Sequence, residues 1–473
     1  MTPSLVLPRS HAPRGNGPLP PSLVSLVPTQ SVGTSLTGIT LTRLILIAAC
    51  LCLVPRPLRA EWPEFRGPWG NGHAAAPDDA RPLGLPLRWS EQENVGWKTP
   101  IPHRGWSTPV VLGGQVWLTT ATLDGHDFFA ISLDAETGRI RFNRRLFHAD
   151  APEPLGNAVN CYGSPSPAIE PGRVYVHFGT YGTACLDTAT FQVLWERRDL
   201  ACRHYRGPAS SCVLFENLLI LSMDGVDVQY LAALDKRTGR TVWKTDRTAQ
   251  WNDLDPQGQP FSEGDLRKAF STPLVIDAGG RPQLVSLGAK AGYAYDPRTG
   301  RELWKVHYTG HSSAPRPVFG RGLALIATGH GTSELWAVRV DGRGDVTGTH
   351  VAWKATRSVP LTASPLLVDD LVYMVSDDGI ATCLEVATGK EVWKRRLGGN
   401  FASSPIYADG RLYFSSQQGK TFVLRPGRSF EVLATNALDS GFMASPAVSG
   451  KALLLRTKTH LYRIESLPPF NPP

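Results

Sequence analysis

The sequence has few charged residues, no long hydrophobic run and none of the common catalytic motifs. Charged residues make up 19% of its 473 positions and hydrophobic residues 42%, which excludes a disordered chain and a coiled coil. The apolar run at 44–54 is too short for a membrane span. Gly-x-x-x-x-Gly-Lys-Ser/Thr, His-Glu-x-x-His and Gly-x-Ser-x-Gly are absent, which excludes the usual nucleotide-hydrolysis, zinc-protease and esterase sites.

Residues 61–473 also lack a large excess of positive or negative charge. Residues 1–60 contain five Arg and no Lys, Asp or Glu, whereas 61–473 contain 44 basic and 41 acidic residues. A body this close to neutrality has no electrostatic footprint for a phosphate backbone. The formal net charge of +8 therefore does not indicate a nucleic-acid partner, and we expect none.

The cysteines lack the spacing of a metal or redox site. Cys50 and Cys52 lie in the N-terminal segment, and the other five form neither an adjacent pair nor a Cys-x-x-Cys. These five are Cys161, Cys185, Cys202, Cys212 and Cys383. In an exported chain they allow one or two disulfides, for example Cys202 with Cys212 or Cys161, and leave at least one thiol over.

Residues 1–60 are predicted to be a leader that contains a signal peptide. Arg43 precedes the apolar run, and Pro55 with a short basic stretch follows it. A short run after a positive charge is typical of a secretory signal peptide, with a buried core helix as the alternative. We therefore expect an extracytoplasmic protein, periplasmic or secreted, whose mature chain has no transmembrane span.

From residue 93 onward the sequence contains a repeat of about 40 residues. Each copy begins with two small residues and a proline, continues with three apolar strands, and reaches a turn of the type Asp-x-x-Thr-Gly-x-x-x-Trp. Pro365 and Pro405 are 40 residues apart, and Pro405 and Pro446 are 41 apart. This is the period of a four-stranded propeller blade.

The geometry of this turn accounts for the residue types found in it. Its carboxylate can accept backbone N–H bonds, and its glycine supplies a positive φ before the fourth strand. Trp243, Trp304 and Trp393 stand four residues after such glycines, where we expect each ring to wedge between blades. Stacking of these rings on a ligand is the alternative.

The first strands predict eight blades. They follow Pro109, Pro167, Ala209, Pro273, Pro317, Pro365, Pro405 and Pro446. The last copy lacks a fourth strand, and residues 94–98 match that strand without the three before it. We predict an all-β fold, an eight-bladed β-propeller of four-stranded antiparallel blades closed by the N-terminal strand, which completes the last blade. The expected parts are the leader at 1–60, an N-terminal segment at 61–92, the propeller at 93–464 and a tail at 465–473.

These repeats resemble the pyrroloquinoline-quinone-type (PQQ-like) propeller repeat family over 93–464. Residues 61–72 are similar to a motif that precedes the propeller in secreted bacterial members. The resemblance implies the fold directly and two classes of function. One is the quinoprotein alcohol and glucose dehydrogenases, which hold the quinone and usually calcium in the central funnel. The other is non-enzymatic, as in the propeller lipoprotein of the outer-membrane β-barrel assembly machinery.

The sequence departs from the quinoprotein pattern. It has no adjacent cysteine pair of the kind that commonly covers the quinone, and the family's catalytic Asp and calcium-binding Glu and Asn find no matching motif. We therefore expect a non-enzymatic binding or scaffold module and assign no catalytic residue. A PQQ-dependent oxidoreductase with a divergent pocket, using PQQ and calcium, is the alternative.

In a propeller, the connection from an outer strand to the next inner strand lies at the mouth of the central channel. Here these connections carry basic, amide and aromatic side chains, which suit an anionic or carbonyl-rich ligand. The predicted cofactor-binding residues are His103, Arg104, Trp106, Asn160, His204, Arg206, Lys268, His311 and Asn400. A solvated channel that binds nothing specific is the alternative, and no metal ligand is predicted.

The two longest insertions, 144–160 and 246–267, fall in these same connections. The carboxylates of the second insertion match no metal-loop spacing, so we expect a solvated loop there and not a calcium site. Long loops on one face are where binding usually occurs. We expect a monomer that uses this face and the mouth to bind a protein partner or an anionic small molecule. Peripheral membrane association stays open.

Overall fold

The computed structural model describes residues 61–76, 79, 81–156 and 158–468, all within one compact unit, Pro57–Pro473. The predicted signal peptide at 44–54 lies outside the described residues. The regular structure of the described part is β-strand, apart from one short 3-10 helix, Phe261–Arg267. No helix in that part is long and apolar enough to cross a bilayer.

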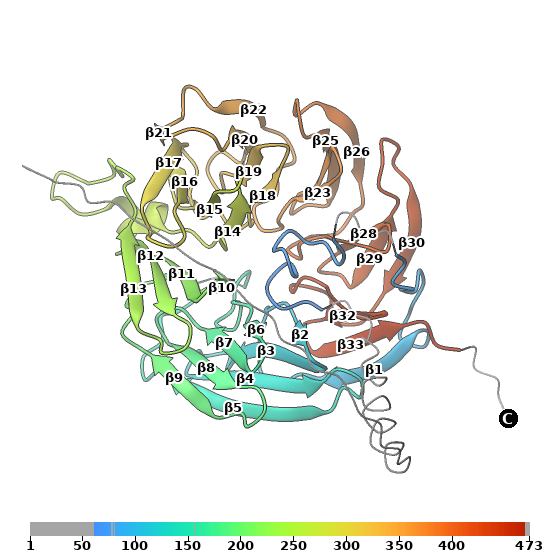
Figure 1. Ribbon diagram of the computed structural model, residues 1–473. Helices are drawn as coiled ribbons and strands as arrows, with labels where there is room; N and C mark the ends of the chain where they lie inside the picture. Colours follow the sequence, from blue (N-terminus) through green and yellow to red (C-terminus); the bar gives the residue numbers. More distant parts are fainter. Residues whose placement is uncertain (1–60, 77–78, 80, 157, 469–473) are drawn as a thin grey trace, which may run out of the picture. The chain divides into compact units, whose positions relative to one another are not determined.

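Eight sheets of the described chain form blades around a common centre (Figure 1), which confirms the predicted all-β, eight-bladed propeller. Blade 1 contains β2 (Val110–Leu112), β3 (Gln115–Ala121), β4 (Asp127–Asp134) and β5 (Ile140–His148). Blade 2 contains β6 (Ala168–Glu170), β7 (Arg173–His177), β8 (Thr183–Asp187) and β9 (Val193–Arg197). Blade 3 contains β10 (Val213–Phe215), β11 (Leu218–Asp224), β12 (Gln229–Asp235) and β13 (Thr241–Asp246). Blade 4 contains β14 (Leu274–Asp277), β15 (Pro282–Leu287), β16 (Ala291–Tyr295) and β17 (Glu302–His307).

The second half of the ring repeats this order. Blade 5 contains β18 (Val318–Gly320), β19 (Leu323–Ala327), β20 (Leu335–Arg339) and β22 (Val351–Ala355). Blade 6 contains β23 (Leu366–Val368), β24 (Leu371–Val375), β25 (Ile380–Glu385) and β26 (Glu391–Arg396). Blade 7 contains β27 (Ile406–Ala408), β28 (Arg411–Ser415), β29 (Lys420–Leu424) and β30 (Val432–Ala437). Blade 8 contains β31 (Ala447–Ser449), β32 (Ala452–Arg456), β33 (His460–Glu465) and, paired antiparallel with β33, the N-terminal strand β1 (Val95–Pro100).

Two faces follow from this connectivity. The loops from each outer strand to the next inner strand, such as 247–273, lie together with the loops between second and third strands; we call this end the mouth face. The turns between first and second strands and between third and fourth strands lie at the other end, which we call the turn face. The two long insertions therefore fall on the mouth face.

The residue two positions before each inner strand, which is small in every blade except blade 5, where it is Arg316, links neighbouring blades. Its backbone N–H donates to the hydroxyl at the same position of the next blade, over 2.9 Å. Within the described chain such bonds join Thr108 to Ser166, Ser166 to Ser211, Ser211 to Thr272, Arg316 to Ser364, Ser364 to Ser404 and Ser404 to Ser445. The repeat retains small hydroxyl residues because each one satisfies a buried backbone donor beside the channel. In blade 3 the residue directly before the inner strand is Cys212, not the predicted Ala209.

A signature tryptophan wedges between blades, as predicted. Trp243 Nε1 donates to the Pro297 carbonyl in the turn of the next blade, at 3.1 Å. A Cβ added to Gly300 of that turn would lie 2.6 Å from the indole, so the contact requires glycine as well as its positive φ. Trp304 instead donates to Gln283 in its own blade, at 2.9 Å, because blade 5 replaces the usual turn with an insertion.

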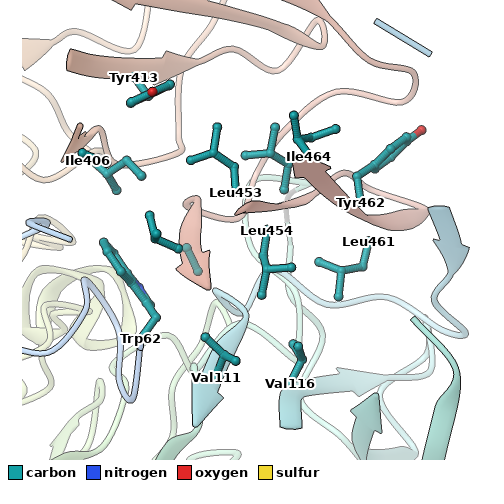
Figure 2. Packing of buried hydrophobic residues seen from close by; sticks show 14 of the residues in the cluster. Trp62, Val111, Val116, Ile406, Tyr413, Leu453, Leu454, Leu461, Tyr462 and Ile464 are labelled. Carbon is teal, nitrogen blue, oxygen red and sulfur yellow. The ribbon is translucent and has the colours of Figure 1, made fainter. Parts of the chain in front are cut away.

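The N-terminal segment belongs to the core. Trp62 is fully buried and its backbone pairs with Val111 of β2. Figure 2 shows Trp62 beside Val111, in the cluster that also contains Ile406 and Leu454 and so joins blades 1, 7 and 8. The segment that precedes the propeller in sequence is therefore packed into it.

Candidate binding site at the channel mouth

A cavity of about 400 Å³ lies on the mouth face, and connections from all eight blades line it. Five of the nine predicted residues are among its walls: Trp106, Asn160, Arg206, Lys268 and His311. The remaining three connections contribute Thr362, Ala402 and Met443. The ring topology thus brings together side chains that are more than 300 residues apart in the sequence.

Lys268 and Arg206 supply the positive charge of the cavity. The Lys268 ammonium is buried and donates to the carboxylate of Asp265, and to the Asp265 carbonyl at 2.9 Å. Burial lowers the pKa of Lys268, and Asp265 opposes that shift. The Arg206 guanidinium lies 4.6 Å from the ring of Tyr205 and forms no ion pair within the described residues. One of the two cations is therefore neutralised and the other is available to a ligand.

His311 and Trp106 supply the neutral polar groups of the cavity. The backbones of His311 and His330 exchange hydrogen bonds of 3.1 and 2.7 Å. Burial and the nearby Lys268 lower the pKa of His311, so its ring is neutral at pH 7. The indole N–H of Trp106 is buried and has no hydrogen-bond partner within the described part of the chain. Such an unmet donor is suited to a ligand carbonyl or to water.

Asn160 lines the cavity but uses its amide to hold a loop. Its Nδ2 donates to the carbonyl of Arg206 at 2.8 Å, and its Oδ1 accepts from the Ser164 hydroxyl at 2.5 Å. Its position therefore fixes the backbone that carries Arg206. Sequence reasoning placed Asn160 correctly in the mouth, but its contacts are those of a positioning residue.

The other four predicted residues do not line the cavity. His204 is buried, its Nε2 accepts the backbone N–H of Thr180 at 3.1 Å, and burial lowers its pKa to about 4. Asn400 is exposed, and its backbone and side chain both bond to Gln418. His103 and Arg104 are also exposed: His103 stacks on Phe129 at 4.1 Å, and the Arg104 guanidinium lies 5.7 Å from Trp106. All four belong to the predicted connections, but their side chains contact other protein groups: His103 contacts strand β4, Arg104 its own connection, and His204 and Asn400 the loops of Thr180 and Gln418.

Three carboxylates of the long insertion, those of Asp253, Asp255 and Asp265, bind groups of the protein itself. Arg267 binds Asp253 through two bonds of 3.0 and 2.6 Å, and Asp255 accepts backbone N–H groups of its own turn. No group of three or more His, Cys, Asp or Glu side chains among the described residues is arranged to hold a metal ion. The cavity wall offers one carboxylate, that of Asp265, already bound to Lys268. This donor set does not fit a calcium-bound quinone.

The disulfides that the cysteine count allowed are not formed among the described residues. All five described cysteines are free and buried, including Cys161, Cys202 and Cys212. The Cys202 thiol instead lies 3.8 Å from Nδ1 of His204. The sequence missed this because an odd cysteine count in an exported chain does not reveal which side chains face each other.

The channel beneath the mouth is filled by two arginines. Arg66 of the N-terminal segment donates to the carbonyls of Pro365 and Pro405, at 2.8 and 3.2 Å. Arg316 donates to the Pro273 carbonyl at 3.0 Å and to Glu64 at 3.1 Å. Both arginines are about 1% exposed, and neither is among the walls of the mouth cavity.

Comparison of the sequence with known proteins gives one family and several relatives. The family model described as Outer membrane protein assembly factor BamB matches residues 227–466. The Outer membrane protein assembly factor BamB of Legionella pneumophila (strain Paris) is 26% identical over 203 residues, which cover 40% of this chain and 49% of that protein. The protein of the same name from Yersinia pestis is 22% identical over 244 residues, 41% of this chain and 58% of that protein. The chain spans about half the length of the curated relatives it matches.

Solved structures share the fold. BamB from Moraxella catarrhalis has a TM-score of 0.54 at 12% identity, covering 78% of this chain and 99% of that chain. The quinohemoprotein alcohol dehydrogenase from Comamonas testosteroni has a TM-score of 0.60 at 13% identity, covering 88% of this chain and 82% of that chain. Because both a dehydrogenase and an assembly factor have this fold, the function has to be inferred from the residues of the site and not from the fold.

Proposed function

Because the chain belongs to the family described as outer membrane protein assembly factor BamB, we propose that it is an extracytoplasmic, non-enzymatic scaffold that binds a protein partner through its mouth face. Residues 1–60 are its export leader, and it acts as a monomer. The partner is a component of outer-membrane protein assembly, as the names of the curated relatives suggest. The missing metal-ligand set within the described residues disfavours the dehydrogenase alternative.

The observation that carries this proposal is a group of exposed apolar side chains on the mouth face of blades 1 to 3. Leu123, Val159, Val228, Leu254 and Phe261 are 36 to 67% exposed and all belong to loops of this face. Of these residues Val159 also lines the mouth cavity, so the apolar group meets the rim of the cavity there. Apolar side chains gathered on one face and bordered by polar groups are typical of protein interaction sites.

The cations of the mouth complement this apolar surface. Arg206 lines the same cavity as Val159 and forms no ion pair within the described residues. A partner that buries the apolar loops would bring one acidic or carbonyl group to Arg206. Arginine at the centre and apolar side chains around it are a common composition of binding hot spots.

The test is capture of assembly components from solubilised outer-membrane extract by the tagged protein. Leu254→Glu with Phe261→Glu should abolish capture, because two charges would be placed in the buried part of the interface. Leu194→Glu with Val242→Glu is the matched control, since these side chains are 46 and 51% exposed on the outer strands of blades 2 and 3. Equal capture by both variants and the wild type would refute the mouth face as the binding surface.

A further inference from the structure

A second cavity, of about 1210 Å³, lies on the turn face, at the opposite end of the blades from the mouth. Turns of two neighbouring blades form most of it: 277–283 and 296–303 from blade 4, and 319–323 and 339–343 from blade 5. Ala352 of β22 and Ala387 in a turn of blade 6 complete the wall of the cavity. We call it the turn-face groove. It shares no residue with the mouth cavity, so what it binds is independent of the proposed function.

One wall of the groove is an insertion that breaks the repeat. Between β20 and β22 the chain leaves blade 5 and forms β21 (Gly344–Asp345), which pairs in parallel with β17 at the edge of blade 4. The backbone N–H of His307 donates to the Thr347 hydroxyl at 2.9 Å and fastens the insertion further. The insertion joins the two blades and holds Arg343 at the groove. This feature is part of the folded sheet and not a free loop.

The groove carries an unbalanced set of charges. Six arginines line it, together with four carboxylates. Each carboxylate already has a partner: Asp277 accepts the N–H of Gly280, Asp296 that of Arg298, Glu302 the Thr248 hydroxyl, and Asp341 lies 3.6 Å from His350. In contrast, the guanidiniums of Arg281, Arg301, Arg321 and Arg343 make no hydrogen bond or ion pair within the described residues. The lining side chains of the groove therefore sum to a charge of +2, six arginines against four carboxylates, and four exposed guanidiniums bind none of those carboxylates, so an acidic group from elsewhere would supply the missing counter-charge.

The chain itself does not supply that counter-charge from its undescribed ends. Residues 1–60 and 469–473 contain no Asp or Glu. The floor of the groove is partly apolar, with Leu303 and Phe319 partly exposed. We propose that the turn-face groove binds an extended, acidic segment of a partner protein, with carboxylates on the unpaired arginines and apolar side chains on this floor.

The chemistry favours a peptide over a small anion or a lipid headgroup. Guanidiniums bind carboxylates through paired hydrogen bonds, and the groove uses arginine throughout, with no lysine in its walls. The cavity is many times larger than one phosphate ion. The four arginines come from four different turns, so a segment with several carboxylates can contact more than one of them, which a single small anion cannot.

The experiment measures fluorescence anisotropy of a labelled peptide of alternating Glu and Leu, about 12 residues long, which spans about 40 Å when extended. The whole protein is titrated into this peptide and into one with Gln in place of Glu. We expect the Glu peptide to bind at least about tenfold more tightly, with affinity falling as salt is raised. Equal binding of the two peptides would overturn the proposal.

The second part of the experiment removes positive charges from the turn-face groove. Arg301→Gln with Arg321→Gln should weaken binding of the Glu peptide about tenfold or more, because charge-assisted bonds are lost. Arg237→Gln with Arg240→Gln is the matched control, since Arg240 occupies in the blade 3 turn the position that Arg301 occupies in blade 4. All four side chains are exposed, so both variants should keep the wild-type melting temperature. Equal loss in the control would overturn the groove as the site.

Two competitors separate the alternatives. Inorganic phosphate at millimolar concentration, or vesicles of phosphatidylglycerol, would overturn the peptide assignment if they bound with the same dependence on Arg301 and Arg321 and displaced the peptide completely. Peptide binding that persists in the Leu254→Glu, Phe261→Glu variant would support the turn-face groove as the binding site of the peptide. Loss of peptide binding in that mouth-face variant would refute it. Failure of the mouth proposal and failure of the groove are thus distinguishable.

Discussion

The ring of Phe142 in blade 1 stacks on the ring of Phe191 in blade 2, with centroids 5.0 Å apart and planes inclined by 17°. In the repeat, the first position is usually tryptophan and the second is the turn glycine on which that tryptophan packs. Phe191 keeps the positive φ of the glycine, at 60°. The two departures from the signature therefore meet in one contact, where the smaller first ring leaves space for a side chain on the turn.

This pairing predicts non-additive stabilities. Phe142→Trp alone should overpack against Phe191 and cost about 1–3 kcal/mol, and Phe191→Gly alone should remove a packed ring at about 2–4 kcal/mol. The double variant recreates the usual tryptophan–glycine contact and should lose less than the sum by at least about 1 kcal/mol. Urea unfolding of the four proteins measures this. Strict additivity would contradict the compensation.

The hydroxyl ring around the channel predicts different roles for two adjacent serines. The Ser404 hydroxyl accepts the backbone N–H of Ser364 in the preceding blade, whereas the buried Ser403 hydroxyl has no partner within the described residues. Ser404→Ala should lower the free energy of unfolding by about 1–3 kcal/mol, because a buried donor is left unmet. Ser403→Ala is the control and should be neutral or stabilising. A larger loss of unfolding free energy for Ser403→Ala than for Ser404→Ala would contradict the stabilising role of the hydroxyl ring.

The sequence predicted features that depend on local turn chemistry and on ring topology. The blade count and the position of the mouth follow from the spacing of the repeat, and five of nine predicted residues line the cavity. The sequence did not predict the directions of side chains that bind groups from another part of the chain. His204 faces Thr180, 24 residues away, and Asn400 faces Gln418. The β17–β21 pairing was also missed, because two residues carry no strand pattern.

The buried, neutral His204 predicts a pH dependence of stability. Its native pKa is about 4 and that of an unfolded histidine about 6.5, so below pH 6.5 the unfolded chain binds a proton that the native chain does not. Stability from this group is present above pH 6.5 and is lost toward pH 4, at up to about 1.4 kcal/mol per pH unit. His204→Gln keeps an acceptor for Thr180 and should flatten this slope. His103→Gln, at an exposed site, is the control, and equal slopes in all three proteins would refute the assignment.

The free cysteines should be unreactive in the native protein. All five described thiols are buried, and burial raises the pKa of Cys212 to about 12. Thiolate is the reactive form, so both access and ionisation oppose alkylation. We expect iodoacetamide at pH 8 to label none of the five in the folded state and all five in urea, as read by peptide mass mapping. Rapid native labelling, or a disulfide-linked peptide, would contradict the structure.

The donor set of the mouth predicts that calcium with the quinone will not stabilise the protein. A ligand at 100 times its dissociation constant raises the free energy of unfolding by about 2.7 kcal/mol, so binding would be visible as a higher melting temperature. The one carboxylate of the cavity wall, Asp265, is bound to Lys268, and calcium requires several oxygen ligands. We expect no shift up to millimolar calcium with micromolar quinone, while a quinoprotein dehydrogenase treated in parallel is stabilised. A saturable shift that disappears in Arg206→Gln would instead make the mouth a cofactor site, because Arg206 is the cavity cation without an ion pair in the described chain.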